Sequence, residues 1–229
     1  MRFDLSALAA TWPYLLKGLW FTLQITLVGV TGGIVFGSLL AVARLSQNRL
    51  VSALATSYVN LMRSIPLILV IFWVFFLVPW AIGWVTRSGR PVAVGASLTI
   101  FITFVLFEAA YYAEIVRAGF RSIAPGQYLA CEALGLSKLH AYIYILFPQA
   151  IRNVLPILLT QTIVLFQDTS LVYVISATDL LGAATKIAQR DGRLVEMYLT
   201  VGVIYFVFCF AASQLVKQLQ GRLAYGVRG

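Results

Sequence analysis

The sequence predicts an all-α integral membrane protein, and two observations lead to this prediction. Of the 229 residues, 61% are hydrophobic and only 11% are charged, whereas a soluble domain is roughly half apolar and a quarter charged. Several apolar runs also reach the roughly 20 residues that a helix needs to cross a hydrocarbon core about 30 Å thick. Water is therefore the wrong solvent for most of this chain.

Five membrane spans are expected within a single domain of residues 1–229. Their expected ranges are 15–43, 51–80, 91–116, 149–175 and 195–216. Since the number of spans is odd, the two ends of the chain should lie on opposite sides of the membrane. Of the Lys and Arg residues near the span ends, nine fall on the side of the C-terminus and seven on the side of the N-terminus. Because positive residues accumulate on the cytoplasmic side, we expect an outside N-terminus and a cytoplasmic C-terminus.

Composition also excludes several kinds of site. The net charge of +9 suits a surface of anionic lipid and requires no nucleic acid as partner. His140 is the only histidine, and the two cysteines, Cys131 and Cys209, stand far apart in a polar loop and in the last apolar run. No cluster of His, Cys or carboxylate residues has the spacing of a metal site, so no metal is expected.

A glycine repeat marks the first span. Gly29, Gly33 and Gly37 recur every four residues, which removes side chains from one helix face and lets another helix approach closely. The sequence leaves open whether that second helix belongs to the same chain or to a partner subunit, because the same physics serves both.

A polar interruption at residues 118–147 separates the third and fourth spans and is longer than a simple turn requires. Pro125 can open a short helix, and Gly135 can close it in the left-handed conformation. Ser137 is a candidate cap for a second helix that ends before Pro148. Helices this short cannot cross a membrane, so they either lie on the headgroups or dock on a soluble protein.

Several segments together resemble the permeases of ABC transporters for polar amino acids. These are MRSIPLIL at 62–69, FEAAYYAEIVRAG at 107–119, LLTQTIVLFQDTSLVYV at 158–174 and QRDG at 189–192. The resemblance covers nearly the whole chain and is strongest to the permease subunits of glutamate/aspartate importers. It implies a bacterial inner-membrane protein that pairs with a homologous permease and receives its substrate from a periplasmic amino-acid-binding protein.

The same resemblance assigns residues 118–147 as the loop that couples the permease to two ATPase subunits. The family pattern there is Glu-Ala-Ala followed by Gly, and this chain has Leu129, Ala130, Cys131 and then Gly135. The leading carboxylate is absent, while the glycine is retained. The sequence contains no G-x-x-x-x-G-K-[ST] loop. ATP and its Mg²⁺ are therefore expected on the partner ATPase, with neither cofactor nor catalytic activity in this chain.

Charged and polar residues inside the expected spans are candidates for the substrate path. Arg63 lies about twelve residues into the second span, close to mid-depth. In the fourth span Gln161 and Asp168 lie on one helix face. We expect Arg63 to meet a substrate carboxylate, and Gln161 and Asp168 to contact its amino group or the arginine. The alternative is a structural ion pair between Arg63 and Asp168.

Further intramembrane groups have structural interpretations. Pro66 and Pro156 lie near the candidate path, and each can break a helix and expose carbonyl groups to a cavity. Glu114 and Arg117 have the i, i+3 spacing of an ion pair at a helix end. Glu108 has two interpretations, a hydrogen bond between helices, which is favoured, and a contact with the substrate.

Three other functions are less well supported by the sequence. A secondary transporter usually has two related halves, and the five expected spans show no internal repeat. A channel needs a filter segment or a ring of like charges, which is not evident. A membrane enzyme needs a nucleophile beside a base, and the one histidine lies in the polar loop, far from any intramembrane serine.

Overall fold

The computed structural model describes residues 5–225, and the side chains of residues 10–222. Within this part of the chain the secondary structure is helical and contains no strand. Five segments are long and apolar enough to cross a membrane, which confirms the expected fold class. They are Ala10–Arg44, Leu67–Val85, Ala96–Arg121, Lys138–Ile175 and Leu194–Arg222.

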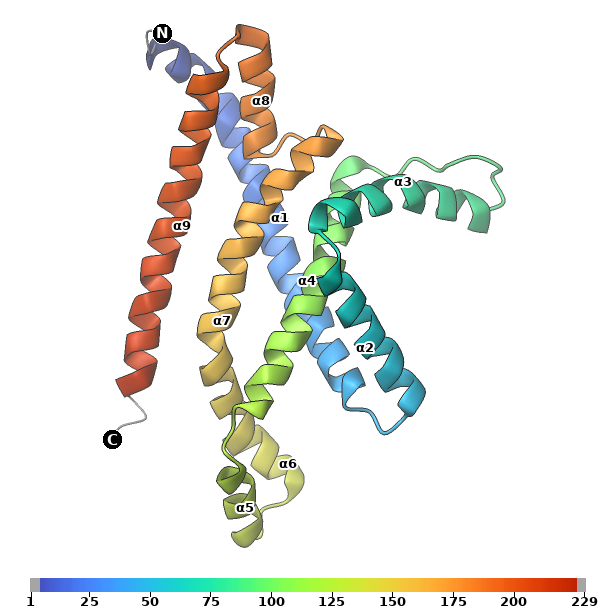
Figure 1. The fold of residues 1–229 in the computed structure, drawn as a ribbon, viewed down its shortest axis with the longest axis vertical. Helices are drawn as coiled ribbons and strands as arrows, with labels where there is room; N and C mark the ends of the chain where they lie inside the picture. The colour runs from blue at the N-terminus through green and yellow to red at the C-terminus, as the bar shows by residue number, and fades with distance from the viewer. Residues whose placement is uncertain (1–4, 226–229) are drawn as a thin grey trace.

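Four long helices run along the length of the molecule (Figure 1). They are α1 (Leu5–Arg44), α4 (Ala96–Arg121), α7 (Phe147–Asp168) and α9 (Leu194–Tyr225). The N-terminal end of α1 and the C-terminal end of α9 lie at opposite ends of the molecule. Many large hydrophobic side chains point outward, among them Leu27, Val42 and Phe206 at 65%, 69% and 66% exposure. Such a surface suits lipid tails rather than water.

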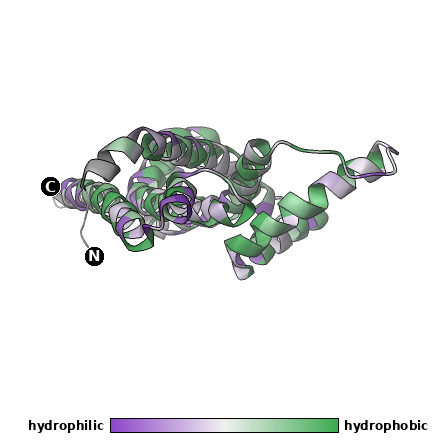
Figure 2. Cartoon of the chain, turned by 90° about the horizontal axis from the view of Figure 1, so that it is seen from above, coloured by the Kyte–Doolittle hydropathy of each residue, from purple (hydrophilic) through white to green (hydrophobic). Residues whose placement is uncertain are grey.

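The second expected span, 51–80, is not one helix. It consists of α2 (Arg49–Ser64) and α3 (Leu67–Val85), separated at Ile65 and Pro66. Ile65 is extended, with φ −114° and ψ 136°. The proline ring disfavours helical backbone in the preceding residue, and proline has no N–H to continue the ladder. After this break α3 projects sideways from the other helices, and seen from above the projecting helix is largely hydrophobic (Figures 1 and 2).

The expected third span also shifts toward the C-terminus. Residues 91–95 are not helical, and α4 begins at Ala96 and continues to Arg121, beyond the expected end at residue 116. The loop at residues 86–95 therefore joins α3 to α4. The fifth helix, expected at 195–216, likewise continues to Tyr225.

The expected end of a helix before Pro148 is wrong. The chain stays helical from α6 (Lys138–His140) through a π-helical segment, η1 (Ala141–Leu146), into α7. Pro148 occupies the first turn of α7, where the wider π-helical turn before it accommodates the missing N–H. After Asp168 the chain continues as a 3₁₀ helix, η2 (Thr169–Ile175), and then α8 (Leu180–Asp191).

The glycine repeat in α1 packs against α4 of the same chain. A Cβ atom at Gly33 would lie 2.7 Å from the Tyr112 ring, and one at Gly37 would lie 2.8 Å from Cβ of Tyr112 and 2.9 Å from the carbonyl oxygen of Ala109. These distances leave no room for a side chain. The contact within the chain, one of the two alternatives that the sequence left open, is the one observed.

The short helix α8 packs against α1 and α9 near the N-terminal end of the molecule (Figure 1). Asp179 caps it, because its carboxylate accepts hydrogen bonds from the backbone N–H groups of Leu181 at 3.1 Å and Gly182 at 2.9 Å. The Leu180 N–H donates to Oγ1 of Thr22 on α1 at 3.1 Å. Burial of Asp179 raises its pKa to about 6, although the two backbone N–H groups and Lys186 oppose this shift.

Replacing Gly37 with leucine should force α1 and α4 apart. Overpacking of this kind costs about 1–3 kcal/mol, measurable as a lower unfolding temperature of the protein in detergent. Gly202→Leu in α9 is the matched control, because a Cβ there meets nothing within 4 Å, and it should change stability by less than about 0.5 kcal/mol. Equal stability of the two variants would contradict the packing described here.

Asp179 should make stability depend on pH. Because the folded pKa of about 6 lies above the ordinary value of 3.8, this group contributes stability below pH 4 that is lost as pH rises through 6. The loss is on the order of 3 kcal/mol. Asp179→Asn keeps a capping oxygen and cannot ionise, so its advantage over the parent protein should grow from pH 4 to pH 7. Parallel unfolding curves across this range would refute the assignment.

Candidate functional site

Arg63 lies in the last turn of α2, directly before the break at Ile65 and Pro66. Its side chain is 40% exposed, and Nη1 lies 3.8 Å from Oε2 of Glu114 on α4. The guanidinium carbon lies 5.7 Å from the centre of the Tyr111 ring, within range of a cation–π contact. Two residues of α4 therefore hold Arg63 beside the helix break, with part of its side chain accessible.

Glu114 is the centre of a cluster of charges that we call the Glu114 cluster, made of Glu114, Arg44, Arg63 and Arg117. Arg44 Nη1 donates to Glu114 Oε2 at 2.6 Å, and Arg117 forms an ion pair with the same carboxylate. The pairing of Glu114 with Arg117 confirms the sequence prediction, whereas Arg44 was not foreseen. Three arginines share one carboxylate, so the cluster keeps an excess of positive charge. Arg63 is its most distant and most exposed cation.

The structure contradicts the alternative in which Arg63 pairs with Asp168. The ion pair of Arg63 is with Glu114. Asp168 is the last residue of α7, is partly buried, and precedes the 3₁₀ helix η2. It nevertheless lies within electrostatic range of Tyr111, as do Arg63 and Glu108. Asp168 thus borders the same region without neutralising the arginine.

Glu108 joins α4 to α7. It is fully buried, and Nε2 of Gln161 donates to its two carboxylate oxygens at 3.4 and 3.2 Å. The hydrogen bond between helices expected for Glu108 is confirmed. It occupies the amide nitrogen of Gln161 and fixes the orientation of that side chain. The amide oxygen of Gln161 remains as a potential acceptor.

Arg63, Glu108, Tyr111, Gln161 and Asp168 form what we call the polar belt, contributed by α2, α4 and α7. The guanidinium group of Arg63 lies on the α2 side, and the carboxyl groups lie on the α4 and α7 sides. Tyr111 was not predicted from the sequence as a member. The available signal was that Tyr111 lies three residues from both Glu108 and Glu114, which makes its side chain a neighbour of each on the helix surface. Within the described residues no group of three or more His, Cys, Asp or Glu could hold a metal ion.

The loop at residues 118–147 extends beyond one end of the long helices (Figure 1). Pro125 begins α5 (Pro125–Ala133), Gly135 has φ +68°, and Oγ of Ser137 accepts from the His140 N–H, all as predicted. Contacts with α7 hold the loop in place, including Nε2 of Gln149 donating to Oε1 of Gln127 at 3.1 Å.

The three residues at the expected coupling position differ in exposure. Leu129 is 64% exposed and Ala130 is also exposed, but Cys131 is 4% exposed and points into the loop. Cys131 therefore supports α5 from within and does not contribute to its exposed surface. Three further large apolar residues extend the exposed surface: Leu134, Leu139 and Tyr144, at 75%, 68% and 71% exposure.

A helical membrane protein with a polar belt between its helices and an exposed helical loop has the features of the membrane component of a transporter. Residues 33–225 match the family described as binding-protein-dependent transport system inner membrane component, and the chain belongs to this family. Membership assigns it a part in transport rather than in catalysis, and implies a binding protein and an ATPase as partners.

Named relatives are similar over nearly their whole length. The chain is 46% identical to the glutamate/aspartate import permease protein GltK of Escherichia coli O6:H1, over 97% of this chain and 99% of the relative. It is 30% identical to the glutamine transport system permease protein GlnP of Escherichia coli K12, with the same coverage. A crystal structure of an amino acid ABC transporter with histidines superposes with a TM-score of 0.86 at 29% identity, covering 97% of this chain and 100% of that one.

Neutralising Glu114 should destabilise the protein, because Glu114→Gln leaves Arg44, 9% exposed, without its counter-charge. A loss of about 3 kcal/mol is expected, the lower end for a broken buried ion pair because Glu114 is partly exposed, measured as a lower unfolding temperature in detergent. The matched control is Glu132→Gln in α5, an exposed carboxylate that should contribute less than about 0.5 kcal/mol. If both variants unfold at the same temperature as the parent protein, the Glu114 cluster does not hold α1, α2 and α4 together.

Proposed function

We propose that this chain is the permease subunit of an ABC importer that carries glutamate or aspartate across the bacterial inner membrane. The observation that carries the proposal is the polar belt with Arg63 beside a broken helix, in a chain 46% identical to a glutamate/aspartate import permease. A permease for another polar amino acid is the second candidate, favoured by the similarity to a glutamine permease.

In the proposed mechanism the polar belt receives the substrate by charge. Arg63 meets a carboxylate of the amino acid, because the Glu114 cluster leaves it with positive charge and 40% exposure. A planar guanidinium matches a carboxylate with two parallel hydrogen bonds. The amide oxygen of Gln161 and the carboxylate of Asp168 accept hydrogen bonds from the substrate ammonium group.

Energy for transport arrives through the loop at residues 118–147. Two ATPase subunits bind ATP and Mg²⁺ and contact the exposed apolar surface of α5 around Leu129 and Ala130. Gly135 permits the turn between the short helices, and Cys131 keeps α5 on the loop. Because α4 ends at Arg121 and leads directly into the loop, a displacement of α5 moves α4 and the Glu114 cluster with it. Access to the polar belt then alternates between the two membrane faces.

The remaining partners follow from the surfaces of the molecule. A homologous permease, forming a heterodimer with this chain, covers part of the apolar face of α3, which projects from the rest of the chain (Figure 1). The loop at 118–147 marks the cytoplasmic side, so the C-terminal end of α9 is cytoplasmic and the N-terminal end of α1 is periplasmic. A periplasmic amino-acid-binding protein delivers the substrate on the side of α8.

The test is uptake of radiolabelled glutamate and hydrolysis of ATP by the complete complex in proteoliposomes. Arg63→Ala should raise the KM for uptake about 10- to 100-fold, the value of one to two charge-assisted hydrogen bonds, while ATP hydrolysis stimulated by the binding protein persists. Arg49→Ala, an exposed residue at the other end of α2, is the control and should leave both activities unchanged.

Two results would overturn parts of the proposal. Unchanged uptake by the Arg63→Ala complex would move the substrate site to the partner permease. Uptake of glutamate that is insensitive to removal of ATP would exclude an ABC importer altogether. Preference for glutamine over glutamate and aspartate in competition would select the second candidate function.

A further inference from the structure

The loop at residues 86–95 is folded tightly against the end of α3. The Val92 N–H donates to the carbonyl oxygen of Pro79 at 3.0 Å, and the Ser88 N–H donates to that of Gly83 at 3.0 Å. The Ser88 hydroxyl donates to the carbonyl oxygen of Arg90 at 2.6 Å. A Cβ atom at Gly83 would lie 2.2 Å from the Arg90 carbonyl oxygen. Only glycine at position 83 therefore allows the loop to lie where it does.

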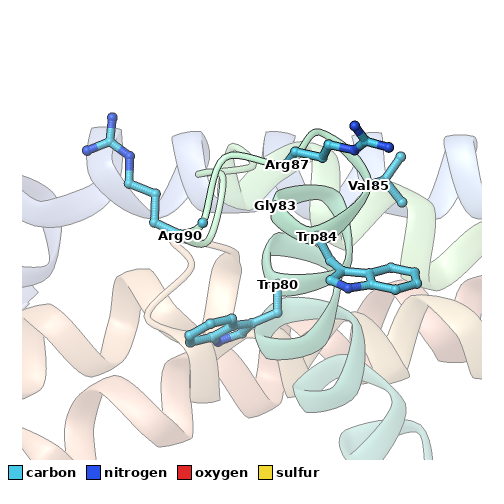
Figure 3. Close-up of a pocket in the computed structure, with 7 residues that line it drawn as sticks. Trp80, Gly83, Trp84, Val85, Arg87 and Arg90 are labelled. Carbon is cyan, nitrogen blue, oxygen red and sulfur yellow. The ribbon is translucent and has the colours of Figure 1, made fainter.

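This folded loop presents two arginines above two tryptophans. Figure 3 shows Arg87 and Arg90 extending to opposite sides of the loop, with the indole rings of Trp80 and Trp84 below them. Arg87 has φ 55°, in the left-handed region that favours glycine. Trp80 and Trp84 are 62% and 85% exposed. With Gly83 and Val85 they line an open concave site of ≈ 630 Å³.

Neither arginine has a carboxylate nearby in the sequence to neutralise it. The chain contains no Asp or Glu between Asp4 and Glu108, and Glu108 is fully buried against Gln161. The salt bridges found among the described residues involve Arg44, Arg63, Arg117, Arg190 and Arg193. Within the part of the chain that the structure describes, Arg87 and Arg90 therefore have no ion pair, and their guanidinium groups are available to an anion.

The surroundings identify the kind of anion. The 19 residues of α3 are almost entirely apolar, and Trp at the end of such a segment is typical of the boundary between hydrocarbon and headgroups. Guanidinium groups bind phosphates with paired hydrogen bonds. We propose that this site, which we call the α3 tip, binds the phosphates of anionic phospholipids, with Trp80 and Trp84 against their glycerol and upper acyl regions. Arg87 and Arg90 contact neighbouring headgroups, because they point to opposite sides.

Lipid fits the α3 tip better than an acidic protein surface does, because the two tryptophans are exposed together with the arginines at the end of an apolar helix. A protein contact made by charge alone needs no indole rings at the hydrocarbon boundary. The site is independent of the substrate path, since it involves none of the polar belt. Its test therefore does not depend on whether glutamate is transported.

The experiment measures quenching of tryptophan fluorescence in the complete complex by brominated phosphatidylglycerol and by brominated phosphatidylcholine. The difference between the parent complex and a Trp80→Phe/Trp84→Phe complex isolates the signal of the α3 tip from all other tryptophans. We expect this signal to report preferential binding of phosphatidylglycerol. Arg87→Gln or Arg90→Gln should reduce the preference about 5-fold each, and the double variant about 30-fold, at the usual contribution of one basic residue near an anionic surface.

Two controls make the result decisive. Arg87→Lys/Arg90→Lys keeps the charge but loses the paired hydrogen bonds, so its preference should lie between those of the parent and the double glutamine variant, which excludes a folding defect as the cause of the loss. Arg49→Gln, at the start of α2, should change nothing at this site. Equal quenching by the two lipids, or a preference that survives the double glutamine variant, would overturn the proposal. The proposal would also be overturned if adding the binding protein, and not the choice of lipid, changed the fluorescence quenching of Trp80 and Trp84.

Discussion

The close contact between α1 and α4 is the constraint on which the other contacts depend. Gly33 and Gly37 bring the backbone of α1 against Tyr112 and Ala109, at a distance that no other residue type permits. In a membrane, burying an apolar side chain between helices gains little free energy, because lipid tails are as apolar as the side chain itself. Close van der Waals contacts such as these therefore stabilise the association of helices. The same approach brings Arg44, at the end of α1, within 2.6 Å of Glu114.

From that contact the polar interior follows step by step. Arg44 and Arg117 hold Glu114, and Glu114 together with Tyr111 holds Arg63 at the end of α2. The break at Ile65 and Pro66 then determines where α2 ends and where Arg63 is presented. Charge is tolerated here because Glu114 pairs with Arg44 and Arg63 on other helices, and Glu108 accepts a hydrogen bond from Gln161. The excess positive charge of the Glu114 cluster is the exception, and it is what a substrate carboxylate can use.

Much of the fold could be predicted from the sequence, since apolar run length, proline and glycine act locally. Pro125, Gly135 and Ser137 have the positions in the loop that their backbone preferences dictate. Pro148 was misjudged because a π-helical turn absorbs it, and such a turn depends on packing around Leu146 and Ala150 rather than on local propensity. In the candidate site, Gln161 and Glu108 were identified separately. The partner of Arg63 could not be found, because the approach of α2 to α4 has no signature in either helix alone.

The π-helical segment η1 has a consequence for how the loop and the membrane interior are aligned. A π-helical turn is equivalent to one extra residue in an α-helix, and each residue of an α-helix turns the following side chains by about 100°. Residues 138–168 form one continuous helical rod about 46 Å long, with the loop at one end and Gln161 and Asp168 toward the other. Residues 141–146 therefore determine the direction in which Gln161 and Asp168 point around the helix axis, relative to the loop at the other end of the helix. A deletion of one residue there would remove none of the contact residues. It would still rotate Gln161 and Asp168 by about 100° relative to the loop.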